Sequence, residues 1–302
     1  MRENLFFLSQ KIRRKFFARE IKQVMIALSN YSPLLRSTIP PMKKITTCFI
    51  SFILSIQFIA AQGVKSYSTA QAHSHNDYER ARPFEDAYEQ QFGSVEADIF
   101  LVNDTLFVAH NLKDIRPNRT FSALYLLPIL QKAEQHGGRI YGQDNVPLQL
   151  LIDLKTEGEA TLAALVKVLE PHKNILVPAG SVKIVVSGNV PDPSLFEKYP
   201  NYIYFDGRPG NVYTPAQMAH IGLISQAFQQ YSKWNGEGPI LEKDKKKIQK
   251  MISEVHDLGK KVRIWATPDN INSWKTMMAL GVDYLNTDKV RELGDYLRTA
   301  PR

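Results

Sequence analysis

The stretch SVEADI occupies residues 94–99, and LLIDLK occupies residues 150–155. Both have the apolar, β-branched composition of buried strands, yet each holds two charged side chains two positions apart. Successive side chains of a strand point to opposite faces, so Glu96 and Asp98 share one face, and the aspartate and lysine of the second stretch share another. Strands that are apolar along their length and charged near their ends indicate a parallel sheet with a site at its carboxyl edge.

Further strand-like runs alternate with helical stretches along the rest of the chain, which is typical of βα units. Eight strands are expected at residues 70–73, 94–99, 150–155, 183–187, 202–206, 223–227, 262–266 and 282–288, with a short extra strand at 106–110. Helices are expected at residues 83–92, 122–136, 159–170, 242–258 and 271–280. The pattern predicts a single-domain (β/α)8 TIM barrel over residues 62–302. A doubly wound open sheet is the alternative, although it would usually need fewer strands.

Nearly every expected strand ends in a polar side chain. In a barrel these ends meet at one mouth, where the active site lies. The positions are His73, Glu96 with Asp98, Asp153 with Lys155, Ser187, Asp206, Ser225, Trp265 and Asp288.

Three carboxylates at one barrel mouth would repel one another unless a cation lay between them. Glu96, Asp98 and Asp153 offer hard oxygen ligands, which suit one divalent cation, Mg2+ or Ca2+. The alternative is a surface-facing pair of acids, but the apolar residues between them are suited to packing against helices.

Histidines form the second group of candidate site residues. His73, His75 and Asn76 close the first expected strand, and His110 closes the short extra one. Hydrolysis of a phosphodiester needs a base to activate the nucleophile and an acid to protonate the leaving alkoxide, and two histidines can fill these roles. The spacing of His73 and His75 also fits metal ligands, which leaves a zinc site open.

The order of these residues resembles the glycerophosphodiester phosphodiesterases, which belong with the phosphatidylinositol-specific phospholipase C-like barrels. The likeness consists of a histidine ending strand one, Glu-x-Asp on strand two, a histidine soon after it, and an acid with a nearby lysine on strand three. It extends from about His73 to Asp288, and includes Trp265 and the segment 281–288.

The resemblance implies a (β/α)8 fold and a divalent metal on the three carboxylates. It implies His73 and His110 as the acid–base pair and Lys155 as a phosphate contact, and we add Asn76 and Trp265 as expected substrate contacts. The sequence departs from the family where an arginine usually follows the first histidine. Here the segment reads HSHND (residues 73–77), so His75 is the alternative to His73.

The N-terminal part of the chain has the character of a leader. Residues 42–61 combine a short cationic stretch, an apolar run and small residues, which predicts a secretory signal peptide. A membrane anchor is the alternative, but the run of about 16 residues is short for a span of roughly 20. Residues 1–41 precede this signal and are interpreted as an upstream extension. The mature protein is therefore expected to be exported, periplasmic or secreted, without a stable membrane span.

Charge and cysteine content argue against nucleic-acid binding and against cysteine-based chemistry. Residues 1–61 hold 10 Lys+Arg and 2 Asp+Glu, whereas the remaining 28 Lys+Arg and 28 Asp+Glu cancel. The basic balance belongs to the leader, so nothing indicates a nucleic-acid partner. The only cysteine, Cys48, also lies there, which excludes disulfides and thiol catalysis from the expected mature chain.

These observations lead to three hypotheses. The first is a metal-dependent phosphoric diester hydrolase acting on a small-molecule or lipid-derived phosphodiester, with a cyclising lyase outcome left open. The second is a noncatalytic binding barrel of the envelope, since a barrel can keep its fold without its chemistry. The third is a zinc phosphomonoesterase or other metallohydrolase using His73 and His75 as ligands.

Overall fold

The structure, a computed structural model, describes residues 66–142 and 147–299, which belong to the compact unit Lys65–Arg302. The expected extension at 1–41 and signal peptide at 42–61 lie outside the described residues. Within the described part of the chain, no helix combines the length and apolar character that crossing a membrane requires.

Eight parallel strands form the centre of the fold, hydrogen-bonded in the order β8-β7-β6-β5-β4-β2-β1-β9. The ninth strand, β3, runs antiparallel to β2 and lies off this path. The strands are β1 Ala72–Ser74, β2 Ser94–Val102, β3 Thr105–Val108, β4 Leu148–Leu154, β5 Val182–Gly188, β6 Ile203–Gly207, β7 Ile221–Ala227, β8 Val262–Trp265 and β9 Leu285–Thr287.

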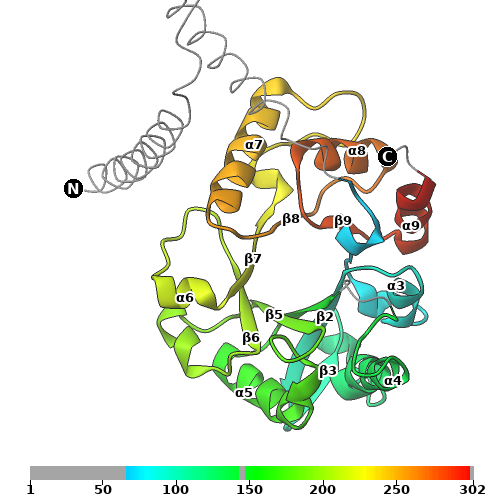
Figure 1. Ribbon diagram of the computed structural model, residues 1–302, viewed down its shortest axis with the longest axis vertical. Helices are drawn as coiled ribbons and strands as arrows, with labels where there is room; N and C mark the ends of the chain where they lie inside the picture. Colours follow the sequence, from blue (N-terminus) through cyan, green and yellow to red (C-terminus); the bar gives the residue numbers. More distant parts are fainter. Residues whose placement is uncertain (1–65, 143–146, 300–302) are drawn as a thin grey trace, which may run out of the picture. The chain divides into compact units, whose positions relative to one another are not determined.

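The two ends of this order meet and close the ring. β1 pairs with both β2 and β9, while a single parallel bridge joins Arg263 to Tyr284 beside the junction of β8 and β9. The helices lie around the outside of the strands (Figure 1). The expected (β/α)8 barrel is therefore confirmed, with the seam between β8 and β9 as its most weakly paired junction.

The helices that connect the strands vary in length. They are α3 Glu85–Glu89, α4 Leu127–Gln135, α5 Gly158–Leu169, α6 Pro215–Ala219, α7 Glu242–Asp257, α8 Ile271–Leu280 and α9 Val290–Thr299. The expected helix 83–92 is shorter than predicted, because Phe84 precedes it with φ of 65° and Gln91 follows with φ of 58°. Helices α6 and α9 were not predicted. The first is only five residues long, too short to show a period, although Thr214 and Gln217 cap it reciprocally.

The inward side of the barrel has an apolar layer below a polar one. Leu151, Val185 and Leu223 form a buried cluster, with Tyr204 packed against it. Each of these residues is followed, two positions later, by a polar residue at the same face of its strand. Those polar residues are Asp153, Ser187, Ser225 and Asp206. Because side chains on one face of a strand recur every two residues, the apolar layer is followed directly by a polar layer at the mouth of the barrel.

The outward faces pack against the helices. Ile152, Val186 and Phe205 alternate with the inward residues and belong to the main hydrophobic core. On α7, Ile248, Ile252 and the neighbouring apolar positions at helical spacing face the same core, while the lysines stay outside. Full burial of each such side chain contributes about 1.5–3 kcal/mol, which fixes the strands that hold the site.

Candidate active site

Three carboxylates converge at the mouth of the barrel. Glu96, Asp98 and Asp153 each offer an oxygen, and these oxygens all lie within 4.8 Å of one another. Asp98 and Asp153 are direct neighbours in the register of β2 and β4, so the pairing of the strands alone brings them together. The three expected metal ligands are thus assembled in one cluster.

Crowding and burial make this cluster electrostatically strained. Burial, and then the charge of Glu96, raise the pKa of Asp98 to about 6. Burial also raises the pKa of Asp153. Lys155 offsets part of the repulsion, with its Nζ 2.9 Å from Asp98 Oδ2 and 3.1 Å from Asp153 Oδ1. Burial alone would lower the pKa of Lys155, but the two aspartates raise it overall.

One oxygen of the cluster is left without a partner. Asp98 Oδ1 is buried and accepts no hydrogen bond from the described residues. An unpartnered buried carboxylate oxygen beside two other acids is the donor set that a hard divalent cation needs. The residues therefore fit a metal ion, held by Glu96, Asp98 and Asp153.

Glu96 is oriented by two neighbours on its Oε2 atom. Arg263 Nη2 lies 2.8 Å from this oxygen and His73 Nε2 lies 2.9 Å from it. Burial would raise the pKa of Glu96, but Arg263 and then His73 hold it well below its usual range. Glu96 therefore stays ionised.

His73 does not face the mouth, contrary to the expectation from the sequence. Its ring is fully buried, and its Nδ1 lies 2.7 Å from Ser94 Oγ while Nε2 contacts Glu96. Burial, and then the charge of Arg263, lower the pKa of His73 to about 3, so the ring is neutral at ordinary pH. The physical reason is register: β1 continues to Ser74, which places His73 one layer below the mouth.

His75 occupies the position expected for His73. It lines the pocket together with the carboxylates, and its Nδ1 lies 2.8 Å from Asp288 Oδ1. Burial would lower the pKa of His75, but the hydrogen bond to Asp288 raises it overall. A histidine oriented by a carboxylate at Nδ1 presents Nε2 as its remaining ring nitrogen.

His110 lies beside Asp98, with its Nδ1 3.9 Å from Asp98 Oδ2, and is more exposed than His75, with 53% of its side chain accessible. Its Nδ1 lies 2.9 Å from the hydroxyl of Tyr78, which donates to Asp98 Oδ2 at 2.7 Å. The same hydroxyl lies 2.9 Å from Asn76 Oδ1, so its one proton already faces two acceptors, and its contact with His110 is best satisfied when Nδ1 donates to the hydroxyl oxygen. That tautomer leaves Nε2 of His110 as a proton acceptor.

Both histidines and all three carboxylates line one pocket of about 290 Å3. All three expected substrate contacts also line it: Lys155, Asn76, and Trp265, which is 36% exposed at the end of β8. Asn76 adopts the left-handed conformation, with φ of 46°, that asparagine tolerates better than most residues. The expected metal ligands, the expected substrate contacts, His75 and His110 therefore line one cavity, whereas His73 does not.

Two residues that line this pocket, Arg208 and Arg263, and one beside it, Tyr78, were not expected from the sequence to have a role. Arg263 stands alone as a charge within apolar β8, two positions before Trp265, and that spacing could have placed it on the inward face. Arg208 lies directly after β6, in a loop. A loop has no regular side-chain period, so the sequence does not predict the direction of this side chain. Tyr78 gave no signal, because its contacts to His110 and Asp98 join separate segments.

Backbone features support the site. Gly188 has φ of 75°, and a Cβ there would lie 2.3 Å from Asp153 Oδ1, so only glycine fits beside this carboxylate.

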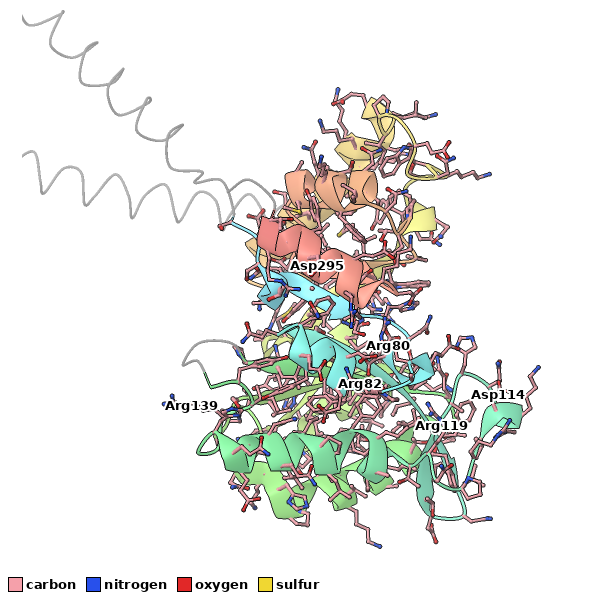
Figure 2. All side chains as sticks on the ribbon, turned by 90° about the vertical axis from the view of Figure 1, so that its right-hand side faces the viewer. Arg80, Arg82, Asp114, Arg119, Arg139 and Asp295 are labelled. Atoms are coloured by element: carbon pink, nitrogen blue, oxygen red, sulfur yellow. The ribbon has the colours of Figure 1, made fainter. Side chains whose placement is uncertain are left out.

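The segment after β1 is held in place by Arg119, which donates to the carbonyl of Tyr78, and by Arg80, which donates to the carbonyl of Asp288 (both labelled in Figure 2).

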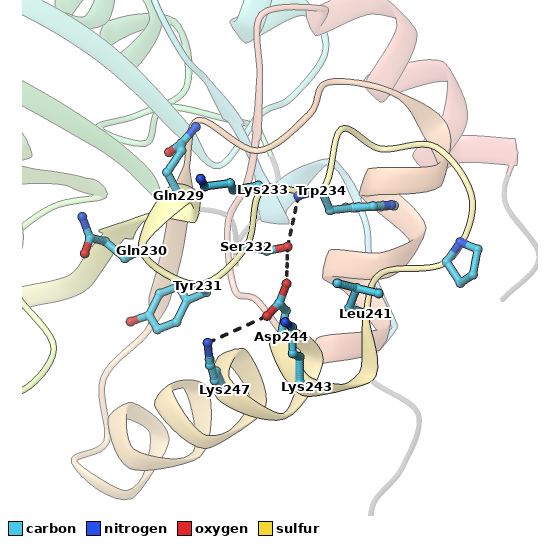
Figure 3. Close-up of a pocket in the computed structure, with 11 residues that line it drawn as sticks. Gln229, Gln230, Tyr231, Ser232, Lys233, Trp234, Leu241, Lys243, Asp244 and Lys247 are labelled. Atoms are coloured by element: carbon cyan, nitrogen blue, oxygen red, sulfur yellow. Dashed lines mark hydrogen bonds and ion pairs between the residues drawn. The ribbon is translucent and has the colours of Figure 1, made fainter.

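A larger cavity of about 600 Å3 lies between β7 and α7 (Figure 3). Its one carboxylate, Asp244, accepts a hydrogen bond from Ser232 at 2.9 Å and lies 3.9 Å from Lys247 Nζ. None of the clustered acids or site histidines lines it. Size alone would favour this cavity, but the chemistry that the sequence predicts lies in the smaller one.

Two family models match the chain. The AIM6-like phosphodiesterase domain matches residues 64–206, which contain the histidines and carboxylates described above. The glycerophosphoryl diester phosphodiesterase family matches residues 261–291, which contain Arg263, Trp265 and Asp288. These matches support a phosphodiesterase-type function.

Curated relatives carry the same family name. A homologue of altered inheritance of mitochondria protein 6 from Arthroderma benhamiae is 28% identical over 74% of this chain and 82% of its own. The protein of that name from Eremothecium gossypii is 28% identical over 72% of this chain and 66% of its own. A solved structure of a glycerophosphodiester phosphodiesterase from Parabacteroides distasonis covers 76% of this chain and 97% of its own, with 16% identity and a TM-score of 0.47.

Proposed function

Because the chain belongs to the glycerophosphodiester phosphodiesterase superfamily, we propose that it is a divalent-metal-dependent phosphoric diester hydrolase. Its substrate is a glycerophosphodiester or a phospholipid-headgroup-like diester. The observation that carries the proposal is the convergence of an acidic cluster, with oxygens within 4.8 Å of one another, and two differently oriented histidines on one pocket.

The charge of the pocket supports a requirement for metal. Before His75 takes up a proton, the pocket lining contains four carboxylates and three cations, a net charge of −1, which would oppose a phosphodiester anion. A divalent cation on Glu96, Asp98 and Asp153 would reverse this sign and neutralise the nonbridging oxygens of the phosphoryl group. The charged groups are Glu96, Asp98, Asp153, Asp206, Lys155, Arg208 and Arg263.

The hydrogen bonds of the two histidines support a different role for each. His110, whose Nδ1 donates to the Tyr78 hydroxyl, accepts a proton from the attacking water at Nε2. His75, whose pKa is raised by its bond to Asp288, holds a proton at Nε2 and gives it to the leaving alkoxide oxygen. Acid and base are thus oriented by different partners, Asp288 for His75 and the Tyr78 hydroxyl for His110.

The dimensions of the pocket support a small substrate arm. A volume of about 290 Å3 is at the lower end of ordinary ligand sites, which suits a glycerol phosphate or a headgroup better than an intact diacyl lipid. Trp265 offers an aromatic face at the entrance, and Asn76 offers an amide. Water is the nucleophile in the reaction that we propose, so the product is a phosphomonoester rather than a cyclic phosphate.

The zinc alternative receives less support from the geometry. It uses His73 and His75 as paired ligands, but both ring nitrogens of His73 are already bonded, to Ser94 and Glu96. The noncatalytic alternative gives no reason for two histidines, each oriented by its own hydrogen-bond partner, to line the pocket with three carboxylates. No specific observation favours either alternative over a diester hydrolase.

We also propose that the protein works outside the cytoplasm, on the strength of the signal-like pattern at residues 42–61. N-terminal sequencing of protein recovered from its native envelope tests this. A start near Gln62 is expected, and an intact N-terminus would remove the proposal.

The activity itself is tested with chelator-treated protein and added Mg2+, Ca2+ or Zn2+. Glycerophosphocholine and bis(p-nitrophenyl) phosphate serve as diesters, and p-nitrophenyl phosphate as the monoester control. We expect diester turnover with Mg2+ or Ca2+ and a phosphomonoester product in the phosphorus NMR spectrum. Faster monoester turnover with Zn2+, or a lasting cyclic phosphate, would contradict the proposal.

A further inference from the structure

The cations of the pocket are not equally free to bind a substrate. Lys155 Nζ lies within 3.1 Å of two carboxylates, Asp98 and Asp153. Arg263 is 3% exposed and donates to Glu96 and to Asn286 Oδ1. Arg208, in contrast, keeps 39% of its side chain accessible while lining the same pocket.

Arg208 is anchored through one nitrogen only. Its Nη1 lies 2.7 Å from Asp206 Oδ2, 3.0 Å from the carbonyl of Gly207 and 3.2 Å from Ser225 Oγ. Among the described residues, Nε and Nη2 have no hydrogen-bond partner. The guanidinium is thus held through Nη1 alone, and the N–H groups of Nε and Nη2 are available to an anion.

The anchor itself is rigid. Asp206 accepts hydrogen bonds from Ser187 Oγ at 3.0 Å and Ser225 Oγ at 2.6 Å, which join β5, β6 and β7. The backbone N–H of Arg208 donates to the hydroxyl of Tyr213 at 3.1 Å, which fixes the segment after β6. A cation held in place before the substrate arrives loses little conformational entropy on binding.

We propose that Arg208 is a substrate-binding residue, which donates from Nε and Nη2 to the nonbridging oxygens of a phosphoryl group. Asp206 positions it without touching the substrate. The inference rests on the proposed function for its substrate class, a phosphate mono- or diester. Arginine suits this role because its planar fork matches two phosphate oxygens, whereas the ammonium of lysine is a single point charge.

The test measures binding as well as turnover. Inorganic phosphate is titrated calorimetrically into the full chain, in the presence of the activating metal ion, for wild type and the Arg208→Ala, Arg208→Lys and Asp206→Asn variants. Arg82→Ala is the control, because Arg82 pairs only with Asp86 and Glu89 on the surface of α3. We expect Arg208→Ala to weaken phosphate binding about 10- to 100-fold, as for a lost charge-assisted hydrogen bond. Arg208→Lys and Asp206→Asn should lie between that variant and wild type.

Diester hydrolysis by the same variants separates this inference from the proposed function. Arg208→Ala should raise KM more than it lowers kcat. If the wild type binds phosphate through Arg208 but hydrolyses no diester, the binding role stands and the proposed function fails. The inference is overturned if Arg208→Ala matches the wild type in both phosphate affinity and KM, or if the wild type binds no phosphate.

Discussion

Nδ1 of His75 lies 2.8 Å from Oδ1 of Asp288, so a residue directly after the last strand of the barrel orients a residue directly after the first. His73 lies two positions earlier and has neither this partner nor access to the pocket. The two histidines therefore have different surroundings, although they lie only two residues apart.

Replacing the two histidines should separate chemistry from stability. We expect His75→Ala to lower kcat on unactivated diesters by about 100- to 10,000-fold, the usual contribution of a general acid. His73→Gln should keep most of its turnover per folded molecule but should melt at a lower temperature, because it disturbs the hydrogen bonds of a buried ring. Steady-state kinetics beside thermal melts give both quantities. Equal kcat for His75→Ala and wild type would contradict the assignment.

His110 and His75 should differ in their dependence on the leaving group. A nitrophenol leaves without needing a proton, so loss of the acid His75 should matter less with that substrate than with an alkyl diester. Loss of the base His110 should cost a similar factor, about 100-fold or more, with both substrates. The measurement is kcat for each alanine variant on the two substrates. The roles are reversed if His110→Ala shows the strong dependence on leaving group.

Metal binding should depend on the clustered acids. Asp98→Asn and Asp153→Asn should each weaken Mg2+ or Ca2+ affinity, because each removes a charged ligand from a partly desolvated site. A metal ion at 100 times its Kd stabilises a folded protein by about 2.7 kcal/mol, so melts with and without chelator report the loss. Glu134→Gln, on exposed α4, is a control with the same type of change. Unchanged metal-dependent melting shifts in both aspartate variants would refute the site.

His73 should make stability depend on pH. Its folded pKa of about 3 lies below the ordinary 6.5, so between these values the unfolded chain binds a proton that the folded chain does not. The unfolding free energy should therefore fall as pH falls, by up to about 1.4 kcal/mol per pH unit. Urea unfolding in chelator between about pH 5 and 6.5 should show a shallower slope for His73→Gln than for wild type. Identical slopes would mean that the ring is not held neutral.

Gly188 should be needed for the metal site as well as for the fold. Gly188→Ala places a Cβ in the left-handed region, at a cost of about 1–2 kcal/mol, and also pushes against Asp153 Oδ1, 2.3 Å away. Gly259→Ala is the matched control, since its φ is 70° but nothing lies within 4 Å of its Cβ. Both variants should lose stability, but only Gly188→Ala should lose metal affinity by calorimetry. Equal metal affinities would show that Asp153 tolerates the displacement.

The arrangement of the carboxylates was predictable because burial on both faces makes a strand obey its two-residue period. Once Glu96 and Asp98 were placed on one face, pairing of β2 with β4 aligned Asp98 with Asp153. The resemblance to the phosphodiesterase superfamily, which depended on this order of residues, was also confirmed.

The register of the first strand was not predictable to within two residues. Strand β1 has only three residues, so its period cannot show whether His73 or His75 reaches the mouth. Arg208 escaped notice because its position depends on Asp206 and on serines of two other strands, contacts that a single segment does not reveal. Contacts between distant segments determine both the register of β1 and the position of Arg208, and the local sequence pattern does not reveal such contacts.

The weakly paired seam between β8 and β9 gives Arg263 a second significance. Its guanidinium reaches across the seam to Asn286 on β9, and further to Glu96 on β2, so one side chain acts as a latch where backbone pairing is sparse. Opening of the seam would withdraw Arg263 from Glu96 and, through β9, disturb the Asp288 contact of His75. Local order at the seam therefore supports the geometry of the candidate site. A substitution of Arg263 would lower activity, although the cause would be a loss of local order at the seam between β8 and β9.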